Sequence, residues 1–188
     1  MLASFSRALE WRDPSMRGHG ARVAAHADAI ARCLGWREAR LEELQIACVV
    51  HDVGKLSVPV EILRKPGRLT EEEFAEVRRH PTAGAQMLET LPQLRAVIPS
   101  VLHHHERWDG DGYPHGRRGD EIPLEARILA VADAFDAMTS PRAYRPALTT
   151  DDALAEVERC AGSQFDPAIA RTFLDAWRDE TLAPAAAL

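Results

Sequence analysis

The stretch HDVGK, residues 51–55, is the part of the sequence around which the rest can be organised. It ends an apolar run, residues 41–50, whose spacing predicts a helix. Adjacent side chains on a regular helix point about 100° apart, so His51 and Asp52 can reach one metal ion only where the helix ends. Gly54 suits a helix end of this kind. Because a carboxylate has two oxygens, Asp52 could bridge two ions while His51 holds one of them.

Composition limits the classes of protein that fit. The chain has 188 residues, of which 46% are hydrophobic and 28% charged, so one domain with a real core is expected. Its net charge of −6 excludes the basic surface of a nucleic-acid binder, and we expect no DNA or RNA partner. No apolar run approaches ~18 residues, and the N-terminus lacks the apolar segment of a signal peptide. We therefore expect a cytoplasmic protein that does not span a membrane.

Apolar spacing and helix-end signals predict an all-α fold, a single-domain bundle of about seven helices. The expected helices cover residues 19–34, 38–51, 70–80, 82–91, 93–106, 123–139, 149–160 and 167–177. The stretches between them, 53–69 and the loop RWDGDGYPHGRRGDEIP, are expected to be loops.

The expected division of the chain is an N-terminal extension or short helix at 1–16, one domain at 17–180 and a flexible tail at 181–188. The residues before His19 are too few for a receiver or sensory domain. The protein then either acts alone or is a fragment of a larger regulator.

Seven side chains that can bind metal lie at or near the predicted helix ends: His19, His51, Asp52, His80, His104, His105 and Asp133. Imidazole and carboxylate ligands without thiolate suit iron, manganese, zinc or nickel, and octahedral geometry favours iron or manganese. A single histidine in a helix is more often structural. The run 103–105 fans over about 200°, so spacing alone does not choose which of these histidines share an ion.

Two motifs together resemble a known family. HDVGK matches the signature of the HD superfamily of metal-dependent phosphohydrolases, and HHERWDGDGYP at 104–114 fits the pattern HHExxDGxGYP of its HD-GYP branch without a gap. The resemblance covers about residues 17–178. It implies an all-α HD-domain-like fold and two divalent metal ions, iron or manganese.

The resemblance also implies a role for each site residue. The first ion would be held by His19, His51, Asp52 and Asp133, and the second by His80, His104 and His105, with Asp52 as the bridge. Some members bind a third metal through a Glu at the position of Ser15, and Ser is a poor ligand, so two ions are expected.

Five further positions would meet substrate or a partner. Arg142 and Arg145 would contact substrate phosphate or guanine, although a solvated turn is the alternative for both. Tyr113 would stack on a base or cover the core. The loop Gly112, Tyr113 and Pro114 would dock a signalling protein such as a diguanylate cyclase.

The implied activity is hydrolysis of cyclic di-GMP to pGpG, and in some members further to GMP. A hydroxide bridging two metal ions would attack phosphorus. Lys55 would be the catalytic cation that offsets charge on the phosphoryl oxygens or assists protonation; a surface lysine is the alternative. Two other functions stay open: hydrolysis of another cyclic dinucleotide or nucleotide, and a non-catalytic module that senses a nucleotide or docks a partner. Oligomeric state is not predicted.

Overall fold

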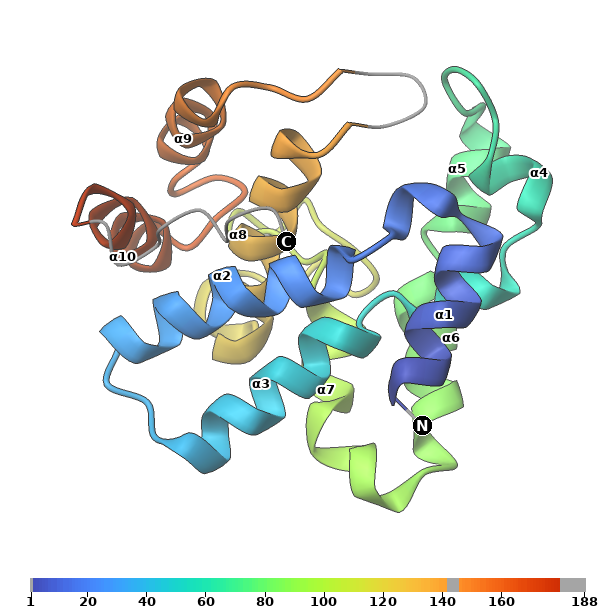
Figure 1. Cartoon of the computed structure of the whole chain (residues 1–188), viewed down its shortest axis with the longest axis horizontal. Coiled ribbons are helices and arrows are strands. Elements are labelled where there is room, and N and C mark those ends of the chain that lie inside the picture. The colour runs from blue at the N-terminus through green and yellow to red at the C-terminus, as the bar shows by residue number, and fades with distance from the viewer. Residues whose placement is uncertain (1, 142–145, 180–188) are drawn as a thin grey trace.

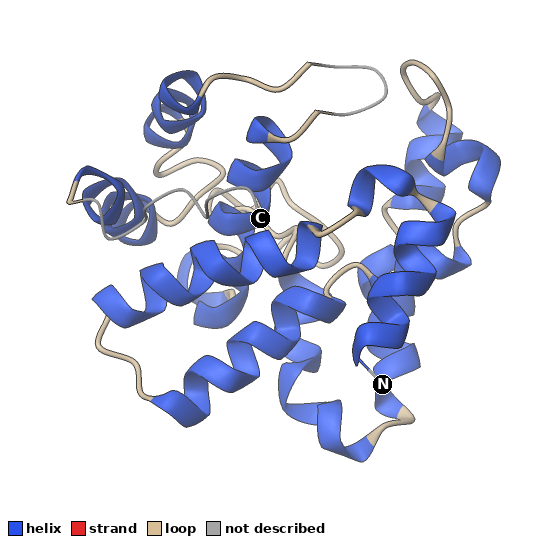
Figure 2. Ribbon diagram, viewed as in Figure 1, coloured by secondary structure: helices blue, strands red, loops and turns tan. Residues whose placement is uncertain are grey.

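The computed structural model describes residues 2–141 and 146–179, and Figure 2 shows this part of the chain as helices joined by loops. The α-helices are α1 Leu2–Arg12, α2 His19–Cys33, α3 Glu38–Val50, α4 Val60–Leu63, α5 Glu71–Val77, α6 His80–Glu89, α7 Ile98–His103, α8 Leu124–Thr139, α9 Thr150–Arg159 and α10 Pro167–Arg178. Short 3-10 segments are η1 Pro14–Met16, η2 Val53–Ser57, η3 Pro92–Val97 and η4 Gly119–Glu121. The predicted all-α class is confirmed. No helix in these ranges is long and apolar enough to cross a bilayer.

Several helix ends follow the signals in the sequence. Gly35, just past α2, has φ +75°, a conformation that favours glycine. At α5, Thr70 and Glu73 form a capping box, because each side chain accepts from the other's backbone N–H. At α10, the Asp166 carboxylate accepts from the backbone N–H of Ala168. These local signals explain why the predicted bounds of α2 and α10 and the predicted start of α5 lie close to the observed ones, whereas α5 ends at Val77 and His80, predicted as its last residue, begins α6.

Two expectations about local structure are wrong. Residues 53–69 are not all loop, because η2 and the single turn α4 lie within them. The expected helix at 93–106 is η3 followed by α7, with Pro99 in the first turn of α7. A proline suits the first turn of a helix and breaks a helix interior, which explains the division.

The helices enclose two apolar cores that share α3. The first core joins α2, α3, α8, α9 and α10 through side chains such as Leu44, Phe135 and Phe173. The second joins α3, α6, η3 and α7 through side chains such as Leu88 and Val101. In Figure 1, α2 and α3 lie side by side, with α9 and α10 on one side of them and α1 and α6 on the other. The C-terminal end of α3 therefore lies where the two cores meet.

Candidate metal centre

One group of metal-capable side chains comes from helices of the first core. His19 is the first residue of α2, His51 follows the last residue of α3, and Asp133 lies within α8. The Nε2 atom of His19 lies 3.3 Å from His51 Nε2 and 3.2 Å from Asp133 Oδ1. Three ligand atoms so close to one another could bind one ion. We call these three residues the first cluster.

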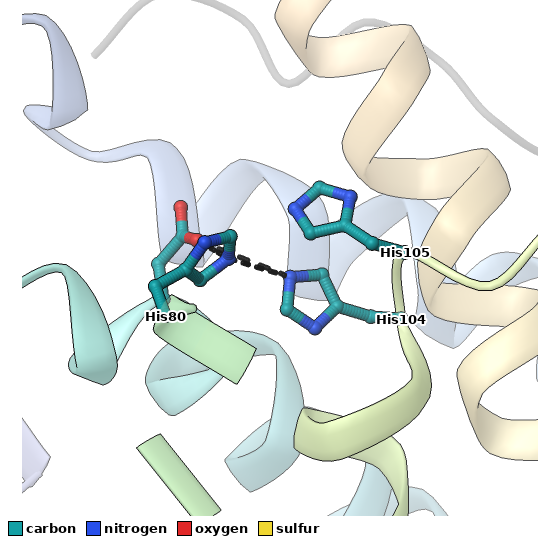
Figure 3. Close-up of side chains that lie close together, drawn as sticks. His80, His104 and His105 are labelled. Atoms are coloured by element: carbon teal, nitrogen blue, oxygen red, sulfur yellow. Dashed lines mark hydrogen bonds and ion pairs between the residues drawn. The ribbon is translucent and has the colours of Figure 1, made fainter. Parts of the chain in front are cut away.

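A second group comes from helices of the second core. His80 is the first residue of α6, and His104 and His105 follow the end of α7. The Nε2 atoms of His80 and His104 lie 3.3 Å apart, and the rings of His104 and His105 have centroids 4.1 Å apart. Figure 3 shows that the three rings lie close together. We call these residues the second cluster.

Asp52 lies between the clusters and turns one carboxylate oxygen toward each. Its Oδ2 lies 3.3 Å from the Nε2 of His51, and its Oδ1 lies 3.1 Å from the Nε2 of His80. It can do so because α3 has ended and Asp52 has φ −95° and ψ 6° as it enters η2. The geometry is that of a carboxylate able to bridge two ions.

The hydrogen bonds behind the second cluster show that the residues fit a cation. The Nδ1–H groups of His80 and His104 donate to the carbonyl oxygens of Val77 and Val101, each at 2.7 Å. Their Nε2 atoms are then bare in the neutral rings, and two bare nitrogens cannot hydrogen-bond to each other. The buried Oδ1 of Asp52 also has no hydrogen-bond donor within the described residues. Backbone carbonyls behind inward-facing imidazoles are the usual support of metal-binding histidines.

The two clusters differ in electrostatics. Burial alone would lower the pKa of His19, but hydrogen bonds with Asp133 and Asp136 outweigh it and raise that pKa to about 9. In the second cluster, burial and the neighbouring His80 lower the pKa of His105 to about 3. Burial and the other histidines hold the pKa of His104 well below its usual value. Without metal, the first cluster therefore carries a proton at neutral pH at His19, whereas His104 and His105 are neutral.

The carboxylates of the centre stay ionised. Burial favours the protonated form of Asp52, but Lys55 and His51 outweigh it and hold its pKa well below the usual value. Burial also favours the protonated form of Asp133, but the hydrogen bond with His19 outweighs this effect and lowers the pKa of Asp133. Both side chains are therefore available as anionic ligands at neutral pH.

Asp136 is a functional residue that the sequence did not reveal. Its Oδ2 accepts from the Nδ1–H of His19 at 2.7 Å, and its Oδ1 accepts from Arg22 Nε at 2.6 Å. It therefore fixes the orientation of His19 from behind. The one available signal was its position three residues after Asp133, on the same side of α8. Its partners lie more than a hundred residues away, so no local pattern could identify it.

His103 does not belong to the centre. It faces away, with its Nδ1 3.5 Å from Oε1 of Glu106 and its ring 5.2 Å from that of the exposed His115. Glu106 accepts from the backbone N–H groups of His115 and Arg117 at 2.8 and 3.0 Å, and so holds the loop that follows. The choice of His104 and His105 over His103, which spacing left open, is thus explained by which rings face Asp52.

Lys55 and Tyr113 both border the centre. The Lys55 Nζ donates to Asp52 Oδ2 at 2.6 Å, so its charge lies beside the buried carboxylate. The Tyr113 ring stacks on His105, with centroids 4.8 Å apart and planes 28° apart. The loop around Gly112 and Pro114 needs its glycine, because a side chain at Gly112 would overlap the backbone of Arg107.

Three other residues considered in the sequence analysis, Arg142, Arg145 and Ser15, belong to neither cluster. Arg142 and Arg145 lie outside the described residues. Ser15 is in η1, and its hydroxyl donates to Asp13 Oδ1 at 2.6 Å.

Comparisons with known proteins agree on one family. A family model described as HD domain matches residues 3–169. The chain is 43% identical to the cyclic di-GMP phosphodiesterase response regulator RpfG of Xanthomonas campestris, over 88% of this chain and 44% of that protein. It is 41% identical to a cyclic di-GMP phosphodiesterase of Thermotoga maritima, over 88% of this chain and 45% of that one. It is also 40% identical to the 3'3'-cGAMP-specific phosphodiesterase 3 of Vibrio cholerae, over 89% of this chain and 36% of that protein. The chain thus spans less than half the length of these relatives.

Solved structures share the fold. A cyclic GMP-AMP specific phosphodiesterase of V. cholerae superposes with a TM-score of 0.73 at 20% identity, covering 96% of this chain and 48% of that one. The PgpH HD domain of L. monocytogenes, in complex with cyclic di-AMP, superposes with a TM-score of 0.61 at 20% identity. The superposition covers 94% of this chain and 96% of that one.

Proposed function

The chain belongs to the HD domain family, which confirms the resemblance drawn from its motifs, and from this we propose that it is a metal-dependent phosphodiesterase acting on cyclic di-GMP. The position of Asp52 is the observation that carries the proposal. One of its oxygens faces the first cluster and the other faces the second. A buried carboxylate between two groups of histidines suits two divalent cations sharing one bridge, and two-metal sites are common in phosphodiester hydrolysis.

We assign the ligands as His19, His51, Asp52 and Asp133 for one ion, and Asp52, His80, His104 and His105 for the other. When bound, the ions would supply the Lewis-acid charge that activates water and offsets charge on the phosphoryl oxygens. Iron or manganese fits the absence of thiolate among these ligands. Ser15 supplies no carboxylate for a third ion.

The chain's own residues would have two further roles. Asp136 and the carbonyls behind His51, His80 and His104 keep the imidazoles oriented. Lys55 sets a positive charge beside Asp52, where a phosphate would approach the ions. Hydrolysis then adds water at phosphorus and breaks the bond to the ribose 3'-oxygen, which leaves with a proton. Opening both phosphodiesters would give GMP, and opening one would give pGpG.

Some predictions remain as stated from the sequence. Arg142 and Arg145 as substrate contacts, and Gly112, Tyr113 and Pro114 as a docking loop for a diguanylate cyclase, are not tested by the described residues. Cytoplasmic localisation and the chain division at 16 and 181 also stay predictions. The family match begins at residue 3, so it includes α1.

The test is turnover by protein of known metal content. The chain would be purified without oxygen and loaded with ferrous iron or manganese, and its metals would be counted. It would then be incubated separately with cyclic di-GMP, 3'3'-cGAMP and cyclic di-AMP, and the products separated by chromatography. We expect about two ions per chain and fastest hydrolysis of cyclic di-GMP.

The other outcomes point to specific alternatives. Fastest hydrolysis of 3'3'-cGAMP would indicate that this chain prefers the substrate named for the V. cholerae relative. Tight binding with two ions and no product would indicate a sensing module. Absence of metal would refute the ligand assignment.

A further inference from the structure

A groove lies beside α5, and Lys55 is part of its lining. It has a volume of about 630 Å³ and lies between η1, the stretch 62–71 and α5. Lys55 lines it, and the same Lys55 donates to Asp52. Lys55 is therefore the residue that connects the groove with the proposed bridging carboxylate. None of the metal-ligand histidines lines it, so its chemistry is separate from that of the centre.

The lining combines apolar side chains with charged ones of both signs, in which Lys55, Arg64, Lys65 and Arg68 outnumber Asp13 and Glu71. Ile62, Leu63 and Leu69 supply apolar surface along the groove. Lys65 also lines it but is paired with Glu73 at 2.6 Å. Arg68 is exposed and has no ion-pair or hydrogen-bond partner among residues 2–141 and 146–179. A ligand with a flat apolar body and a negative charge matches this surface.

Among the side chains that line the groove, Phe74 best suits stacking against a flat ligand. Its ring is an exposed aromatic on α5, with 38% of its surface accessible. The Arg78 guanidinium lies 4.4 Å from the centroid of this ring and 5.4 Å from that of Tyr113. Arg78 does not line the groove, and its guanidinium forms a cation–π contact with the Phe74 ring. The same guanidinium lies near Tyr113, which stacks on His105, so Phe74 is close to the metal centre.

We propose that this groove is a nucleobase subsite, in which a purine base of the substrate stacks on Phe74 while Lys55 and Arg68 offset the charge of its phosphates. The inference rests on the proposed function and deepens it, because it names the place of the nucleoside next to the scissile phosphate. Stacking of a base on an aromatic side chain contributes substantially to affinity and tolerates any base. Phe74 is then a binding residue for the nucleoside, separate from the residues that hold metal.

The test measures equilibrium binding and needs no turnover. The manganese-loaded full chain would be titrated calorimetrically with GMP and, separately, with inorganic phosphate. We expect wild type to bind GMP more tightly than phosphate. Phe74→Ala should weaken GMP binding about tenfold or more, with little change for phosphate. Phe74→Trp should retain GMP binding, and Phe74→Leu, which keeps apolar bulk without a ring, should behave as the alanine variant.

Leu34→Ala is the matched control, because Leu34 is 37% exposed at the end of α2 and touches neither the groove nor the centre. It should bind both probes as wild type does. Equal affinity for GMP and phosphate in wild type, or unchanged GMP binding in Phe74→Ala, would overturn the subsite. A chain that binds GMP through Phe74 but hydrolyses no cyclic dinucleotide would instead refute the proposed function and keep the subsite.

Discussion

The first and second clusters are built from the same kinds of side chain, yet their surroundings differ. His19 of the first cluster has the carboxylates of Asp133 and Asp136 around it. His80 and His104 of the second have backbone carbonyls behind them and share only Asp52. A carboxylate carries full charge, whereas a carbonyl carries only a dipole. Ligand type alone therefore does not define a metal site, because the atoms behind the ligands decide which protons a metal must displace.

The largest expected effect follows from removing the one residue that both clusters share. Asp52→Ala should lower the metal content from about two ions to less than one per chain. Turnover of cyclic di-GMP or of bis(p-nitrophenyl) phosphate should fall on the order of 10³-fold, because several kcal/mol of transition-state stabilisation is lost. Metal analysis and initial rates measure the two effects. Asp151→Ala, on the exposed first turn of α9, is the control. Full metal content in Asp52→Ala would mean that the clusters bind independently.

A smaller effect should separate the clusters. Asp136→Asn keeps the size of the side chain but removes the charge behind His19. We expect the metal of the first cluster to bind about 10- to 100-fold more weakly, because supporting groups of this kind tune metal affinity by that amount. The second cluster should be unaffected. Titration with a competing chelator measures this as one ion lost at lower chelator concentration than the other. Equal weakening of both ions would show that Asp136 acts through the fold, and thermal unfolding of the metal-free variant would reveal such an effect.

The smallest effect per step, about tenfold for each pH unit, concerns pH. The pKa of His19 is raised to about 9 in the metal-free chain, so this side chain is protonated below that pH and metal must displace its proton. The apparent affinity of the first cluster should therefore rise about tenfold per pH unit from 7 to 9 and level off above 9. His104 and His105 have lowered pKa values and are already neutral at pH 7, so they add no pH dependence in this window. Calorimetry in buffers of different ionisation enthalpy counts the protons released. Equal pH dependence of both ions would contradict the difference between the clusters.

Much of the fold could be predicted because its signals are local. The apolar spacing of α2, the capping box at Thr70 and the Asp166-Pro167 step each act within one or two turns of helix. The turn α4 was missed because four residues are too few to show a helical period. Pro59 directly precedes this turn, and a proline both interrupts a helix and suits a helix start, so its presence does not distinguish a loop from α4.

The residues of the metal centre also divide into those that local sequence signals predict and those that depend on the folded chain. The proposed ligands were identifiable because two dense motifs carry most of them. Asp136 was missed because its importance depends on Arg22 and His19, which meet it only in the folded chain. The assumed role of Gly54 was also wrong. Its φ is not in the left-handed region, so it does not end α3 as a left-handed cap, and it is needed for a different reason.

That reason is close approach of two backbones. A methyl group at Gly54 would overlap the carbonyl of His80, and its other near neighbour is the backbone of Gly84. The segment that carries Asp52 and the helix that carries His80 are thus joined by main-chain atoms, without a side chain between them. This contact does not involve the stretch 62–71, which forms one wall of the groove. The sequence of that wall can therefore vary without disturbing the contact between the two segments that carry Asp52 and His80.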